Sequence, residues 1–143
     1  NPQIIIQGFR YFNVYGPNED HKGNQASPIH KFAEQAKQGK IKLFEKSENY
    51  KRDFVCVSDI CEVHEKMLDI NEKGVYNIGT GTAISFQQVA ELVANKYSAD
   101  IEYIPMPDNL KGQYQQYTCA NLDSLSTLIT HRFKSVEEYI NGC

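Results

Sequence analysis

Residues 53–78 read DFVCVSDICEVHEKMLDINEKGVYNI, and this stretch decides the fold class. A short β-favouring run at 54–57 comes first, and Ser58 and Asp59 then offer side-chain oxygens that can cap a helix. Apolar residues recur at helical spacing up to about position 71, and Gly74 introduces a second β-favouring run at 75–78. Strand, helix and strand therefore alternate, and a helix at the crossover favours parallel pairing of its strands. The stretch predicts an α/β architecture.

The same alternation extends to both sides of this stretch. A polar loop is expected up to about position 25, and an irregular, Tyr- and Gln-rich connection at 105–120. Pro28 suits the first turn of a helix, and Ser85-x-x-Gln88 matches a capping box. The further elements expected are strands at 4–12, 42–44 and 101–104, and helices at 27–38, 85–97, 121–129 and from 135 onward.

Length and charge exclude several classes of protein. The 143 residues include 15 Lys and Arg against 18 Asp and Glu, a formal net charge of −3, and 41% are hydrophobic. This composition suits one folded domain and excludes intrinsic disorder of the whole. Cations are scattered, whereas general nucleic-acid binding needs them clustered on one face. No run approaches the roughly 20 apolar residues of a membrane span.

The start of the chain predicts that it is a fragment. Residue 1 is Asn, and a strand pattern begins within four residues, with no room for a leader. The four cysteines, at 56, 61, 119 and 143, form no CxxC pair and have no companion histidine at zinc spacing. Reduced thiols in a cytoplasmic protein are therefore expected, and no metal site. The four histidines, at 21, 30, 64 and 131, are interpreted as structural or exposed.

Two glycines invite comparison with a dinucleotide-binding fingerprint. Gly79-x-Gly81 follows a strand and precedes a helix, as the first two glycines of GxGxxG do. The third position is Ile84, although a glycine is needed there for close packing of helix on strand. No acidic residue ends a following strand at the required distance. A tight structural turn is the prediction.

Three polar side chains admit a functional and a structural interpretation. Arg52 could offer its donor fork to a phosphate, or it could form an ordinary surface ion pair. Lys22, in a glycine-containing loop, could bind phosphate or exchange a proton, or it could simply be solvated. Tyr114 could stack on a ring or sugar, or pack against the core. Considered singly, Arg52 and Lys22 favour the structural interpretation, and the two roles of Tyr114 are about equal.

Three motifs in order resemble those of a known enzyme superfamily. They are GFRYFNVYGP at 8–17, Arg52-Asp53-Phe54-Val55-x-Val57-x-Asp59, and Tyr76-Asn77-Ile78-Gly79-x-Gly81. Together they resemble the extended short-chain dehydrogenase/reductases that act on nucleotide sugars. Within that superfamily, HKG at 21–23, LFEKSENYKR at 43–52 and LKGxYQ at 110–115 are similar to the ADP-L-glycero-D-manno-heptose 6-epimerases.

The resemblance implies a fold and a reaction. The chain would be the C-terminal part of an NAD(P)-binding Rossmann-type protein, with residues 1–143 carrying the sugar-nucleotide portion and the last Rossmann strands. The reaction implied is epimerisation at C6 of ADP-D-glycero-D-manno-heptose by transient oxidation and re-reduction on NADP, which serves synthesis of the lipopolysaccharide inner core. Homo-oligomers and a cytoplasmic location are implied as well. Other nucleotide-sugar epimerases or dehydratases, and a non-catalytic nucleotide-sugar-binding domain, remain open as alternatives.

The resemblance also implies a role for individual residues. Lys22 would be an acid/base group bordering the cofactor, and the Val14 backbone would lie beside the nicotinamide. Arg52 would clamp the diphosphate, and Tyr114 would close over the nucleotide sugar. The other residues expected to bind substrate are Asn13, Asn24, Lys31, Phe44, Glu45, Lys46 and Ser47. Neither G-x-x-G-x-x-G nor Tyr-x-x-x-Lys occurs in this sequence, so these 143 residues alone are expected to be inactive.

Overall fold

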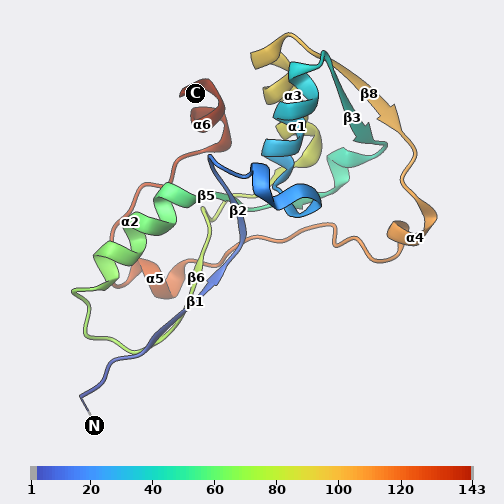
Figure 1. Ribbon diagram of the computed structural model, residues 1–143. Helices are drawn as coiled ribbons and strands as arrows, with labels where there is room; N and C mark the ends of the chain where they lie inside the picture. Colours follow the sequence, from blue (N-terminus) through green and yellow to red (C-terminus); the bar gives the residue numbers. More distant parts are fainter. Residues whose placement is uncertain (1–2, 143) are drawn as a thin grey trace.

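The computed structural model describes residues 3–142, and its strands and helices alternate along the chain as predicted (Figure 1). Strand β5 (Phe54–Cys56) leads into helix α2 (Val57–Met67), which crosses to strand β6 (Gly74–Ile78). Strand β1 (Gln7–Tyr11) pairs with β6, and β2 (Asn13–Tyr15) pairs with β5, both in parallel. The predicted α/β class and the parallel pairing around α2 are confirmed.

The predicted single strand at 4–12 is wrong at both ends. Residues 4–6 precede β1, and the strand breaks after Tyr11. The break has a physical cause, because the chain changes its partner there. The Phe12 amide donates to Ile78 O at 3.0 Å, and the next amide, of Asn13, donates to Asp53 O at 3.0 Å. β1 and β2 are therefore one path laid against two different strands.

A second group of elements stands beside this one. Helices α1 (Pro28–Lys37) and α3 (Phe86–Tyr97) lie side by side, and strands β3 (Lys40–Phe44) and β8 (Asp100–Ile104) pair in parallel next to them (Figure 1). A short antiparallel pair, β4 (Lys51–Arg52) with β7 (Ile84–Ser85), connects the two groups. The remaining elements are η1 (Asp20–Gln25), η2 (Ser47–Asn49), α4 (Asp108–Lys111), α5 (Asp123–Ser126) and α6 (Val136–Gly142).

Helix caps follow the sequence at α1 and α3 but not at α2. The Ser27 side chain accepts from the His30 amide, and Ser85 and Gln88 form the full capping box. In α2 the N-cap is Cys56, and Asp59 is turned inward instead of capping. α2 also ends at Met67 rather than at 71, and α5 is shorter than the helix expected at 121–129. The connection at 105–120 contains the short helix α4, which was not predicted.

The inward turn of Asp59 ties the C-terminal segment to α2. Its Oδ1 accepts from His131 Nε2 at 2.9 Å, and its Oδ2 accepts from the Lys134 amide at 2.9 Å. Lys66 Nζ donates to His131 Nδ1 at 2.8 Å, so both ring nitrogens of this histidine have partners. The structural role expected for His131 is confirmed.

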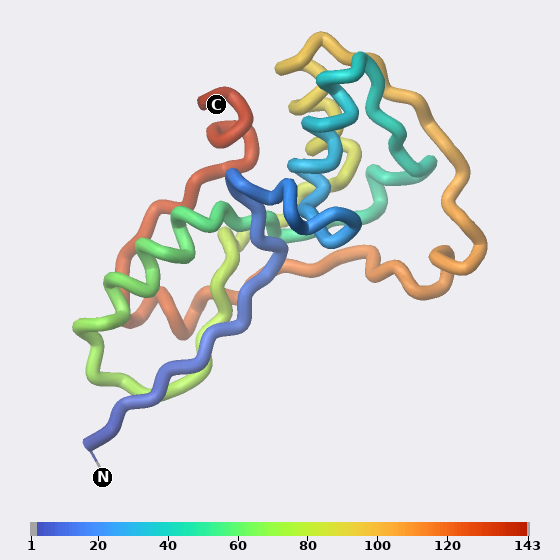
Figure 2. Tube along the Cα trace, in the orientation of Figure 1, coloured from blue at the N-terminus to red at the C-terminus, as the bar shows by residue number. Residues whose placement is uncertain are grey.

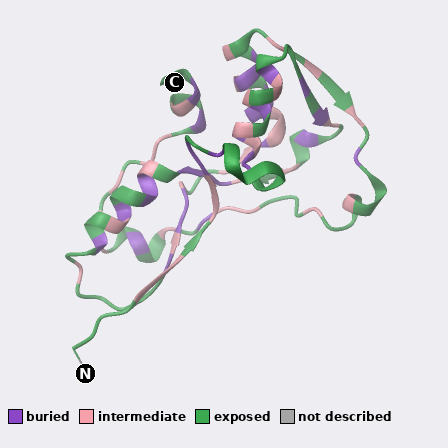
Figure 3. Cartoon of the chain, viewed as in Figure 1, coloured by how far each residue is buried: buried purple, intermediate pink, exposed green. Residues whose placement is uncertain are grey.

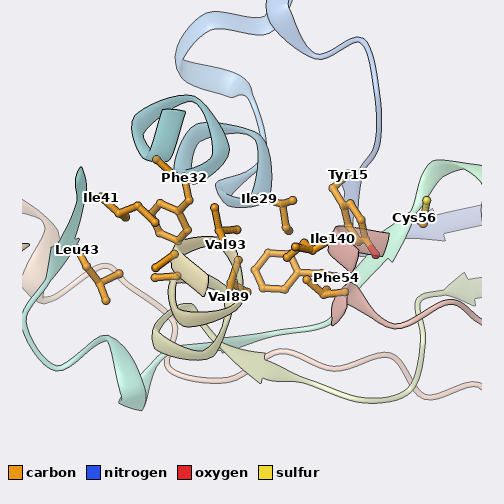
Figure 4. Close-up of a cluster of buried hydrophobic side chains, with 14 residues drawn as sticks. Tyr15, Ile29, Phe32, Ile41, Leu43, Phe54, Cys56, Val89, Val93 and Ile140 are labelled. Carbon is orange, nitrogen blue, oxygen red and sulfur yellow. The ribbon is translucent and has the colours of Figure 1, made fainter. Parts of the chain in front are cut away.

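Buried side chains form two clusters, one for each group of elements (Figure 3). The larger lies between α1, α3, α6 and the neighbouring strands, and Figure 4 shows Phe32, Val93 and Phe54 meeting within it. The smaller lies between α2, α5 and the strands β5 and β6. Burial of this kind stabilises by roughly 25 cal/mol per Å² of apolar surface removed from water.

The N-terminal segment runs outward from the β1–β6 pair (Figure 2). Ile4 and Ile6 are 62% and 73% exposed, and Val75 on β6 is 60% exposed. The expected exposure of apolar side chains beside β1 is therefore observed. Within residues 3–142, no helix has both the length and the apolar character needed to cross a bilayer.

Candidate functional site

A cavity of about 360 Å³ opens between α1, the end of β3, and the connection that carries Tyr114. Four of the residues expected to bind substrate line it: Lys31 from α1, Phe44 from β3, Ser47 from η2, and Tyr114. These positions are distant in sequence, and the fold brings them to one place. The lining is mostly apolar, with the Lys31 ammonium supplying positive charge.

Arg52 stands at an aromatic wall of this cavity. Its guanidinium carbon lies 5.5 Å from the centre of the Phe86 ring and 5.6 Å from that of Tyr114, and both rings line the cavity. Partial burial lowers the pKa of Arg52, a shift opposed by its interaction with Tyr114. An arginine remains charged nonetheless. One guanidinium nitrogen, Nη1, donates to Lys51 O at 2.8 Å, and among the described residues no carboxylate lies within ion-pair distance of the guanidinium. A surface ion pair is thus not what holds this side chain.

The turn after β3 separates the four residues of 44–47. Lys46 has a left-handed backbone (φ 65°), and this turn lets Ser47 donate its hydroxyl hydrogen to Phe44 O. Phe44 and Ser47 face the cavity, whereas Glu45 and Lys46 are exposed and do not line it. Of this predicted stretch, only its two ends are brought to the cavity.

The loop that carries Lys22 is held by one buried carboxylate. Glu19 accepts from Ser27 Oγ at 2.7 Å, from the Ser27 amide at 3.0 Å, from the Gly16 amide at 3.3 Å, and from Lys22 Nζ at 3.3 Å. Gly23 provides the turn, with φ 53° and ψ −123°. Lys22 is not among the residues that line the cavity, but its loop reaches it, because Asn24 O accepts from Lys31 Nζ at 2.6 Å.

Glu19 gives this loop a predictable acid sensitivity. Burial alone raises the pKa of Glu19, but its hydrogen bonds from Ser27, Gly16 and Lys22 outweigh burial and leave the pKa below the ordinary 4.5. A carboxylate with a lowered folded-state pKa contributes stability above its unfolded pKa and loses it as pH falls through the folded pKa. At neutral pH we expect Glu19→Gln to lower the free energy of unfolding of the intact protein by about 1–3 kcal/mol.

Urea denaturation of the wild type and Glu19→Gln between pH 7 and pH 3 measures this effect. The difference between the two is expected to shrink as pH falls below 4.5, the ordinary value for glutamate. Glu48→Gln, an exposed change in η2, is the matched control. A wild-type-to-variant difference that stays constant over the whole range would contradict the assignment.

Asn13 and Val14 lie on β2, away from this cavity. The Asn13 amide is used in the sheet, and the Val14 side chain packs against the smaller buried cluster. The structure therefore does not bring these two residues to the other substrate-binding candidates. Their expected contacts with substrate and nicotinamide stay predictions.

The Gly79-x-Gly81 turn closes around an internal carboxylate. Asp53 is fully buried, and it accepts from the Thr80 amide and hydroxyl, both at 2.7 Å, and from the amides of Gly81 at 2.9 Å and Ala120 at 3.1 Å. A Cβ added at Gly79 would lie 2.6 Å from Asp53 Oδ2. The predicted structural turn is confirmed, and a dinucleotide pyrophosphate does not fit here, because a negative group already takes the amide hydrogens.

Sequence reasoning missed several walls of the cavity. Gln35 and Lys42 line it, and Gln35 Oε1 accepts from the Lys42 amide at 2.8 Å. Phe86 was assigned only to a buried helical face, yet it lines the cavity beneath Arg52. Its position directly after the N-cap Ser85 was a usable signal, because the first turn of a helix commonly faces a binding cavity. The other missed lining residues are Tyr50, Ile104 and Met106.

The described cysteines are free thiols, as expected. Cys56 is buried, Cys119 is half-buried and Cys61 is exposed. Cys143 lies outside the described residues.

Solved structures of two nucleotide-sugar epimerases resemble this chain closely. The ADP-L-glycero-D-manno-heptose-6-epimerase of Helicobacter pylori superposes with a TM-score of 0.82 at 27% identity, over 96% of this chain and 43% of that one. The UDP-glucose 4-epimerase of Thermotoga maritima superposes with a TM-score of 0.79, also at 27% identity, over 94% and 43%. The chain thus spans less than half the length of these structures.

A third structure and a family model agree with this. The UDP-glucose 4-epimerase of Thermus thermophilus, solved in complex with NAD, gives a TM-score of 0.72 at 26% identity over 94% of this chain and 45% of that one. Residues 3–79, more than half of the chain, match the model of the NAD dependent epimerase/dehydratase family. The motifs, the Rossmann-like alternation of strands and helices, and these matches lead to one conclusion: this chain belongs to the NAD dependent epimerase/dehydratase family.

Proposed function

We propose that this chain is the substrate-binding part of an ADP-L-glycero-D-manno-heptose 6-epimerase. The intact cytoplasmic, homo-oligomeric enzyme uses NADP to epimerise C6 of ADP-D-glycero-D-manno-heptose, a step in lipopolysaccharide inner-core synthesis. The observation that carries the proposal is the cavity in which Lys31, Phe44, Ser47 and Tyr114 converge beside Arg52. Apolar and aromatic walls suit a base, and two cations suit a diphosphate.

The arrangement of charge supports a diphosphate ligand. The chain as a whole has a net charge of −3, yet this cavity has Lys31 in its lining and Arg52 at its edge. The Arg52 guanidinium lies against two rings, so its fork is held in place before a ligand arrives. An arginine held in this way can donate to two phosphate oxygens at once.

Lys22 is proposed as the acid/base residue of this chain. It lies on the loop that Glu19 anchors, and that loop touches Lys31 through Asn24. NADP, bound by the intact protein, supplies hydride exchange at C6. Binding of the dinucleotide pyrophosphate is assigned to sequence outside this chain, since the Gly79 turn holds Asp53 instead.

Incubating the intact protein with NADP and ADP-D-glycero-D-manno-heptose tests the proposal directly. NMR is expected to show conversion to the L-glycero epimer, with no net change in NADP. Absence of interconversion by a folded, NADP-loaded protein would overturn it.

A UDP-sugar epimerase is the second candidate, because the Thermotoga maritima UDP-glucose 4-epimerase matches at the same 27% identity. Competition separates the two candidates. ADP is expected to inhibit more strongly than UDP if the walls around Phe44 and Ser47 select adenine, and stronger inhibition by UDP would favour the second candidate.

Arg52 provides a prediction about binding. Arg52→Lys in the intact protein is expected to weaken ADP binding by about tenfold or more, because lysine keeps the charge but loses the planar fork. Titration calorimetry with ADP measures the change. Arg132→Lys is the control, since Arg132 is exposed and pairs with Glu138. Unchanged affinity in Arg52→Lys would show that the fork does not hold the diphosphate.

A further inference from the structure

We propose that Asp20, His30 and Glu34 bind a divalent first-row transition-metal ion, with zinc as the representative. One ligand atom from each residue lies within 4.8 Å of the other two. The inference does not depend on the reaction of the intact protein. It concerns a surface beside the cavity, where the loop that carries Lys22 meets α1 (Figure 1).

The three residues come together because of local structure. His30 and Glu34 are four residues apart on α1, so their side chains lie on the same face one turn apart. Asp20 comes from η1, which folds back against this face. An imidazole nitrogen with two carboxylates is a ligand set that zinc accepts, with a fourth position left for water.

The separation of two ligand atoms fits coordination better than direct bonding. His30 Nε2 lies 3.4 Å from Asp20 Oδ1. A charge-assisted hydrogen bond between these groups would be about 2.7–2.9 Å long. Two ligands on a tetrahedral zinc, each about 2.0–2.2 Å from the metal, are separated by about 3.3–3.5 Å. The pair is therefore spaced as the edge of a coordination tetrahedron.

Burial and charge also favour a cation at this place. The His30 side chain is 20% exposed, so its ring is held by surrounding atoms, while Asp20 is 90% exposed and free to adjust. With a neutral imidazole, the set carries two negative charges. Lys37 already exploits this charge, since its Nζ lies 2.7 Å from Glu34 Oε1. A metal would compete with this lysine.

A second cluster of the same composition shows what a structural set looks like. Asp59, Glu62 and His131 also lie within 4.8 Å of one another. There, however, His131 donates to Asp59 at 2.9 Å and accepts from Lys66 at 2.8 Å, so both ring nitrogens are used. The His30 ring has only the 3.4 Å approach of Asp20 among the described carboxylates. The difference marks the His30 cluster as the one able to ligate.

A metal here would fix the loop next to the proposed site. Asp20 is two residues before Lys22, and His30 is next to Lys31. Lys31 already donates to Asn24 O from the other side of the same loop. A bound ion therefore adds a second tie between η1 and α1, and acts by positioning Lys22 and Lys31.

The test is calorimetric titration of zinc chloride into the intact, chelator-stripped protein. The wild type is expected to bind one more zinc ion per chain than His30→Ala, or to bind it at least about tenfold more tightly. His21→Ala removes a neighbouring exposed histidine outside the cluster and is expected to match the wild type. Magnesium is not expected to compete, because it prefers all-oxygen sites.

Two further variants make the result decisive. Lys37→Ala removes the competing ammonium and is expected to tighten zinc binding, whereas Glu34→Gln is expected to weaken it. Cobalt(II) in place of zinc is expected to give a visible absorption band that disappears in His30→Ala. Zinc binding that is absent from the wild type, or unchanged in both His30→Ala and Glu34→Gln, would overturn the proposal.

Discussion

Lys22→Met in the intact enzyme is expected to lower kcat by about 10²-fold or more, the usual scale for loss of a general acid/base. Methionine keeps much of the length of the side chain but cannot exchange a proton. The loop should keep its shape, because Glu19 retains donors from Ser27 and Gly16 when Lys22 is replaced. Steady-state kinetics with the ADP-linked heptose measure the effect.

Lys22→Arg separates proton transfer from simple positive charge. Arginine keeps the charge but does not release its proton, so an acid/base role predicts a loss in kcat close to that of methionine. If arginine restores turnover, Lys22 serves as a cation alone. Lys40→Met is the control, because Lys40 is exposed and lies on β3 away from this loop. Unchanged kcat in Lys22→Met would refute both roles.

Asp53→Asn is expected to lower the free energy of unfolding by about 3 kcal/mol or more. Each carboxylate oxygen of Asp53 accepts from at least one backbone amide: Oδ1 from Thr80, and Oδ2 from Gly81 and Ala120. An asparagine places an NH₂ group against one of these amides, whichever way its side chain is turned. A buried donor would then lose its acceptor.

Urea denaturation of the intact protein at neutral pH measures this loss. Asp108→Asn is the matched control, because the Asp108 side chain is 96% exposed. Gly79→Ala should also destabilise, since its Cβ would lie 2.7 Å from Ala120 Cβ as well as against Asp53. Stability of Asp53→Asn equal to that of the control would show that the carboxylate does not hold the turn.

Local signals in the sequence predicted most of the fold. The caps at Ser27 and Ser85 are short-range hydrogen bonds, so nearby residues determine them. Asp59 failed as a cap because His131 and the Lys134 amide, more than seventy residues away, bind its carboxylate. The strand break at Phe12 was missed for a similar reason, since a change of strand partner leaves no local pattern.

The candidate site was only partly predictable for the same reason. Motif resemblance identified Lys31, Phe44, Ser47 and Tyr114, all of which line the cavity. Phe86 carries no motif of its own, and only the fold sets it beneath Arg52. Glu45 and Lys46 were included because they adjoin Phe44, yet the turn at Lys46 directs them to solvent.

The sequence by itself determined the α/β class, the order of the elements, the family resemblance and the structural nature of the glycine turn. All of these depend on periodicity, caps or motifs within short segments. The tertiary structure alone decided which carboxylates are internal ligands, which cations stand beside the cavity, and which residues approach His30. Such choices depend on contacts between residues far apart in the chain, and the free energy of those contacts exists only once the segments have packed together.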